Sequence, residues 1–162
     1  MVTTLSCDEF RSRLDAFERR LQSDLMGTAL VERVPLGADD DNWIDTSLTP
    51  TNTRALGLSW IWNGELILQS NAGGGARWEL TPCEEDLALL ERIVQAVVAG
   101  RVTTVAAFGR DGIFVTPADG QVEATTCING CLSGLIPQIG WTHWGRTRTF
   151  EPYADASRTE IP

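Results

Sequence analysis

Two stretches of the chain place apolar residues three or four positions apart, the spacing that predicts an amphipathic helix. The first opens with Ser6 and Glu9 in a capping-box pattern and continues with Phe10, Leu14, Phe17, Leu21 and Leu25. The second opens at residues 81–84 with Thr-Pro-Cys-Glu, a capping-box pattern that also has proline at the first helical position. We predict helices over residues 6–25 and 82–99.

The remaining apolar residues alternate with polar ones or form short runs between turn residues, which is typical of strands. Asn63-Gly64 indicates a two-residue hairpin turn within residues 58–68. With that turn, Ile61, Leu66 and Leu68 fall on one face of the hairpin, and Leu58, Trp60, Trp62 and Ile67 fall on the other. We predict further strands over residues 29–34, 76–80, 102–108, 113–116, 121–126 and 141–150.

The segment 37–53 is rich in Asp, Ser, Thr and Pro, and it predicts a long loop. The order helix, strands, helix, strands predicts an α+β fold, a mostly antiparallel sheet of about six to eight strands with two main helices packed against it. We expect a single domain over residues 1–162, with its core at about 5–153 and a loose C-terminal tail.

Acidic residues outnumber basic ones by 22 to 13, which gives a formal net charge of −9. Binding to phosphates needs clustered basic residues, and anionic membranes repel an acidic surface. We therefore expect no nucleic-acid partner and no membrane partner, whereas a basic protein is attracted. The N-terminal residues lack the pattern of an export signal, so we predict a cytoplasmic protein whose four cysteines are thiols.

The residue types exclude several classes of enzyme. The chain has no lysine, which excludes a P-loop lysine and a Schiff-base lysine. His143 is its single histidine, which excludes a zinc site built on two histidines. Ser133 does not stand in a Gly-x-Ser-x-Gly pattern, so the nucleophile elbow of a serine hydrolase is absent. We predict no cofactor, and a protein that is not an enzyme is favoured.

The segment 37–53 carries the strongest candidate for a partner-binding site, formed by Asp39, Asp40, Asp41, Trp43 and Asp45. Carboxylates attract a basic surface, and a tryptophan gives a large contact area at a low cost in conformational entropy. A calcium site is disfavoured because the glycine and the terminal glutamate of an EF-hand loop are missing. The leading hypothesis is a non-catalytic acidic protein that docks on a basic protein, such as a toxin or an enzyme, as immunity and inhibitor proteins do.

The alternative function is that of a small-ligand-binding protein or an unusual small enzyme with a tryptophan-lined pocket. Its residues are Trp60, Trp62, Trp141, His143, Trp144, Arg146 and Arg148. Arg146 and Arg148 are two positions apart, so on a strand they share a face and could hold a phosphate or a carboxylate. A simpler interpretation places Trp60 and Trp62 in the core beneath a helix, and the two arginines in surface ion pairs.

Cys127, Cys131 and His143 have part of the spacing of a zinc finger, but a fourth ligand would have to be the distant Cys83 or Cys7. A Cys-His nucleophile pair is a further alternative, and it needs an environment that forms a thiolate. We favour inert thiols and predict no metal site.

Overall fold

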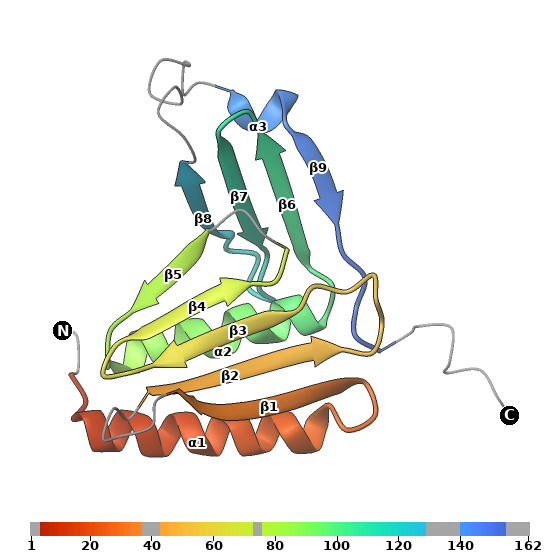
Figure 1. Cartoon of the computed structure of the whole chain (residues 1–162). Coiled ribbons are helices and arrows are strands. Elements are labelled where there is room, and N and C mark those ends of the chain that lie inside the picture. The colour runs from red at the N-terminus through yellow and green to blue at the C-terminus, as the bar shows by residue number, and fades with distance from the viewer. Residues whose placement is uncertain (1–3, 37–42, 73–75, 129–139, 155–162) are drawn as a thin grey trace, which may run out of the picture.

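The computed structural model describes residues 4–36, 43–72, 76–128 and 140–154. Within these residues the chain forms a five-stranded sheet and a four-stranded sheet. In Figure 1 the two sheets diverge from each other, with α1 (Cys7–Asp24) lying along the lower sheet and α2 (Glu84–Val98) near the place where the sheets meet. The α+β class is confirmed, but the described residues form nine strands in two antiparallel sheets, slightly more strands than predicted.

The first sheet is a meander in which each strand pairs with the next along the chain. Its strands are β1 (Ala29–Leu36), β2 (Trp43–Pro50), β3 (Leu58–Trp62), β4 (Leu66–Ser70) and β5 (Arg77–Leu80). The second sheet has the order β8-β7-β6-β9, so its last strand returns beside its first. These strands are β6 (Val102–Ala107), β7 (Arg110–Val115), β8 (Glu123–Ile128) and β9 (Arg146–Thr149).

Helix α1 (Cys7–Asp24) starts at the predicted capping box. The Glu9 amide donates to the Ser6 hydroxyl, and the Ser6 amide and hydroxyl donate back to the Glu9 carboxylate. These hydrogen bonds from Ser6 hold the pKa of Glu9 below its ordinary value. The stabilisation of the folded state by the ionised Glu9 carboxylate is therefore complete above the ordinary pKa of a glutamate, and it is lost as the pH falls through the lowered pKa.

Helix α2 (Glu84–Val98) starts two residues later than predicted. Its N-cap is Cys83, whose sulfur accepts the Asp86 amide at 3.4 Å. The Asp86 carboxylate in turn accepts both the amide and the hydroxyl of Thr81 at 2.7 Å. Because these bonds hold residues 81–83 outside the helix, Pro82 precedes the cap instead of occupying the first turn.

The predicted hairpin between β3 and β4 is present, but its register differs by one residue. Trp62 pairs with Leu66, so the turn consists of the three residues 63–65, and Gly64 takes a φ of +105°. A one-residue change reverses the face of every residue on one strand. Leu66 and Leu68 therefore share the inner face with the tryptophans of β3, and the predicted division of this hairpin into faces is wrong.

The predicted loop 37–53 is also wrong in part, because residues 43–50 form β2. In this strand Ile44, Thr46 and Leu48 point into the core, while the residues between them point outward. Thr46 weakens the alternation of apolar and polar residues by which a strand is predicted. The cost of burying its hydroxyl is offset by a hydrogen bond to the buried Glu18. The last predicted strand begins later as well, since α3 (Trp141–Trp144) precedes β9.

One apolar cluster joins both sheets and both long helices. Inner residues of the first sheet, the apolar faces of α1 and α2, and Val102, Ile113 and Val115 of the second sheet all belong to it. No helix in the described part of the chain is both long enough and apolar enough to cross a lipid bilayer.

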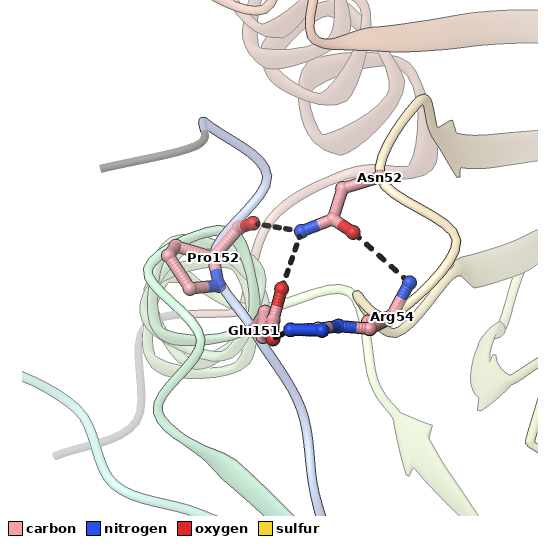
Figure 2. A network of polar contacts seen from close by, with 4 residues as sticks. All are labelled: Asn52, Arg54, Glu151 and Pro152. Carbon is pink, nitrogen blue, oxygen red and sulfur yellow. Dashed lines mark hydrogen bonds and ion pairs between the residues drawn. The ribbon is translucent and has the colours of Figure 1, made fainter. Parts of the chain in front are cut away.

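The segment that follows β9 is linked by hydrogen bonds and an ion pair to the turn between β2 and β3, as Figure 2 shows. The Asn52 side-chain amide donates to the Glu151 carboxylate at 3.3 Å and to the Pro152 carbonyl at 3.0 Å. Arg54 forms an ion pair with Glu151. Nearby, the buried Tyr153 hydroxyl donates to the Leu56 carbonyl at 2.6 Å, and burial raises the pKa of this hydroxyl. The two sheets are thus linked by polar contacts as well as by the core.

Replacing Tyr153 with phenylalanine is expected to lower the free energy of unfolding by about 1–2 kcal/mol, because the Leu56 carbonyl loses its donor while the ring volume is kept. Urea denaturation followed by circular dichroism measures this change. Thr51→Val is a matched control, since its hydroxyl bond to the Thr28 carbonyl is exposed. An equal loss in both variants would contradict the role of burial.

Candidate docking surface

The two long helices cover one face of the five-stranded sheet through aromatic side chains and a buried carboxylate. Phe10 stacks on Trp62 with ring centroids 4.8 Å apart, and Phe17 lies against Trp60 at 6.3 Å. Glu18 accepts hydrogen bonds from the Trp60 indole at 2.9 Å and the Thr46 hydroxyl at 2.8 Å. All of these contacts come from α1. The apolar face of α2 belongs to the same buried cluster as these inward strand residues, and two ion pairs join α2 to α1, so both helices lie on the same side of the sheet.

The opposite side of this sheet carries an apolar surface that neither long helix covers. Cross-strand pairing puts one outward residue from each strand into a row, in the order Val34, Asp45, Ile61, Ile67 and Glu79. Leu36 and Trp43 form a neighbouring pair on the same side, and Leu30 lies further along β1. We call this surface the open face, and its apolar members are Leu30, Val34, Leu36, Trp43, Ile61 and Ile67.

The exposure of these side chains distinguishes the open face from the rest of the described surface. Leu30 is 54% exposed, Val34 52%, Trp43 41% and Leu36 37%. Eight large hydrophobic side chains are exposed among the described residues, and these four of them lie together on β1 and β2. Clustered apolar side chains on a soluble surface mark an interaction site far more often than scattered ones do.

The charges on the open face are mainly acidic. Glu32, Asp45 and Glu79 point outward, and Arg77, the basic side chain beside them, is paired with Glu79 at 2.6 Å. Within the described residues Glu32 and Asp45 have no ion pair. The open face thus combines an apolar patch with free negative charge.

Asp45 has an unusual environment for a carboxylate. It lies between Val34 of β1 and Ile61 of β3, and its Oδ1 atom is shielded from solvent. No described residue donates a hydrogen bond to this atom. Part of the carboxylate is therefore desolvated without compensation, which raises its energy in the free protein.

The predicted partner-binding residues fall into two groups. Trp43 and Asp45 lie two positions apart on the open face of β2, so the structure brings them onto one surface. Asp39, Asp40 and Asp41 lie outside the described residues. The described part of this candidate site therefore lies on a strand of the sheet, whereas the sequence predicted a loop.

The predicted tryptophan-lined pocket does not form from the residues proposed for it. Trp60 and Trp62 are buried on the inner face of β3 beneath α1. Trp141 lies on α3, where it packs against Phe114 of β7 with ring centroids 6.4 Å apart. The first pair is buried because α1 packs on this face of β3 through Phe10 and Phe17.

The remaining members of that predicted set are also separated. Arg146 and Arg148 share one face of the second sheet with Ala106 and Thr104, while Trp141 lies against Gly112 on the other face. His143 and Trp144 are exposed on α3. Arg148 lies over the Phe150 ring at 4.7 Å, and among the described residues neither arginine forms an ion pair.

The cysteines are placed as follows. Cys7 is exposed, Cys83 is buried and Cys127 is half-buried, all as thiols, while Cys131 lies outside the described residues. Among the residues that are described, no group of three His, Cys, Asp or Glu side chains is placed to hold a metal ion.

The sequence interpretation missed the apolar residues of β1, β3 and β4 that complete the open face. The sequence of β1 did indicate its part of this face, because Leu30, Val34 and Leu36 are separated by even numbers of residues and therefore point to the same side of a strand. For Ile61 and Ile67 the signal was hidden by the wrong turn length. Searches with protein-family models, curated proteins and solved structures find no significant match to this chain.

Proposed function

We propose that this chain is a non-catalytic acidic binding protein that docks on a basic protein through the open face, as an immunity or inhibitor protein does. The observation that carries the proposal is the grouping of Trp43 and three aliphatic side chains with unpaired carboxylates on a sheet face that, within the described residues, neither long helix covers. Apolar contacts supply most of the affinity of such an interface, and complementary charge supplies orientation and a fast association rate.

The charge of the chain favours a basic partner over a second copy of itself. A symmetric dimer through the open face would bring Glu32, Asp45 and Glu79 of both copies into one interface. Like charges in such an arrangement cost free energy, and the formal net charge of −9 adds to the repulsion. A protein with clustered Arg or Lys meets the same surface with attraction.

The test compares two exposed tryptophans. Trp43→Ala is expected to weaken binding to the purified partner at least tenfold, because a central tryptophan is a frequent hot spot of an interface. Trp144→Ala is the matched control, since Trp144 is similarly exposed but lies on α3 beside the other sheet, and we expect its affinity to change less than about twofold.

The partner is first isolated from the host by cross-linking to the wild-type chain, and its affinity for each variant is then measured by calorimetry. The proposal requires that the partner be basic, that binding weaken with salt, and that cross-links map to β1 and β2. Equal affinity of the Trp43→Ala and Trp144→Ala variants would refute it, as would a purified partner that cross-links only to the second sheet.

A further inference from the structure

We infer that the partner engages the open face with an arginine side chain whose guanidinium pairs with Asp45 and lies on the Trp43 ring. This inference rests on the proposed function, and it names the chemical group that the surface selects. It starts from the Asp45 carboxylate, which lies between two aliphatic side chains and has one oxygen that is shielded and receives no hydrogen bond from the described residues.

A carboxylate in this position favours a partner that supplies a positively charged hydrogen-bond donor. In the free protein the Oδ1 atom is shielded from solvent, while the side chain as a whole is only partly buried. When a partner covers the apolar patch, the remaining water is removed, and an unpaired carboxylate would then oppose binding. A cation that pairs with Asp45 removes this penalty, so partners that lack one are rejected.

The neighbouring indole favours arginine over lysine. Trp43 and Asp45 are two positions apart in β2 and point to the same side of the sheet. A planar guanidinium can form two parallel hydrogen bonds with a carboxylate and can stack on an aromatic ring at the same time, whereas an ammonium group is compact and more strongly hydrated. Rotation about the terminal torsion of Asp45 turns the shielded oxygen toward such a donor at little cost.

The experiment uses two blocked peptides that differ in one group. The probes are acetyl-Leu-Arg-Leu-amide and acetyl-Leu-citrulline-Leu-amide, since citrulline has nearly the shape of arginine without its charge. Each is titrated into the wild-type protein and into Asp45→Asn, and the Trp43 indole resonance is followed by NMR. Glu85→Gln, an exposed carboxylate on α2, is the control for the change in net charge.

We expect the arginine peptide to bind the wild-type protein at least about threefold more tightly than the citrulline peptide, and the two peptides to bind Asp45→Asn equally. Glu85→Gln should keep the preference for arginine. Equal affinities on the wild-type protein, a preference that survives in Asp45→Asn, or no shift of the Trp43 resonance with either peptide would overturn the inference.

The result is separable from that of the proposed function. If Trp43→Ala abolishes partner binding while Asp45→Asn leaves it unchanged and the peptides bind alike, the open face is the docking surface but arginine is not what it selects. If the arginine preference is found while Trp43→Ala has no effect on the partner, the selective site exists and the proposed docking surface is wrong.

Discussion

Replacing Trp60 with alanine is expected to lower the free energy of unfolding by about 3–5 kcal/mol. The side chain is completely buried on the central strand of the first sheet, and its ring packs against Phe17. Its removal leaves a large cavity and also takes one of two hydrogen bonds from Glu18. A loss of this size is a large fraction of the stability of an ordinary domain.

Chemical denaturation monitored by circular dichroism measures this effect, with the midpoint and the slope fitted separately. Trp144→Ala is the control, because that side chain is half-exposed on α3, and its expected change is below about 0.5 kcal/mol. The comparison decides between the two roles considered for Trp60. A loss below about 1 kcal/mol would mean that the ring is not part of the core, and a ligand platform would regain support.

Replacing Glu18 with alanine is expected to lower the free energy of unfolding by about 2–4 kcal/mol, the second largest effect that we predict. Its carboxylate accepts from the Trp60 indole and the Thr46 hydroxyl, and both donors are buried. Arg33 lies 3.7 Å from the other carboxylate oxygen and pairs with Asp15 at 2.6 Å. Removing the carboxylate leaves two buried donors without an acceptor, so α1 loses its hydrogen bonds to β2 and β3 while the ion pair between Asp15 and Arg33 of β1 remains.

The matched control is Glu91→Ala, which breaks an exposed ion pair with Arg20 and should change the stability by less than about 0.5 kcal/mol. Glu18→Gln separates the contributions at the buried site, because its carbonyl oxygen can still accept from both donors. We expect Glu18→Gln to recover more than half of the loss. If it is as destabilising as Glu18→Ala, the charge facing Arg33 rather than the hydrogen bonds holds the helix.

The proposed docking surface and the stability of the fold depend on opposite faces of the same strands. In β2, Thr46 points to Glu18 and its neighbour Asp45 points to the open face. Substitutions on the open face are therefore expected to change binding with little change in stability. Substitutions on the inner face are expected to lower the stability. This division allows loss of function to be told apart from loss of folding in each experiment above.

The helices and the hairpin were predictable because their determinants lie close together in the sequence. The Ser6 capping box and the apolar spacing of α1 act within a few residues, and Asn63-Gly64 marks a turn without reference to the rest of the chain. The same holds for the absence of lysine and for the acidic net charge, which limit the classes of function open to the chain whatever its fold. Trp43 and Asp45 were identified in this way as candidates for binding.

Tertiary structure decided which side of each strand is covered. One additional residue in the turn after Trp62 placed Leu66 and Leu68 on the same face as the tryptophans of β3, and Ile67 on the same face as Ile61. Contacts with α1 then decided that the tryptophan face is the buried one. The polar Thr46 made the sequence of β2 resemble a loop. Its side chain can be buried because its hydroxyl donates a hydrogen bond to Glu18, which lies on a helix 28 positions earlier in the chain. Burial depends on contacts between distant segments, and a strand with apolar residues on both faces does not specify which face the helices will cover. For this reason the sequence identified individual residues, and only the fold assembled them into a surface.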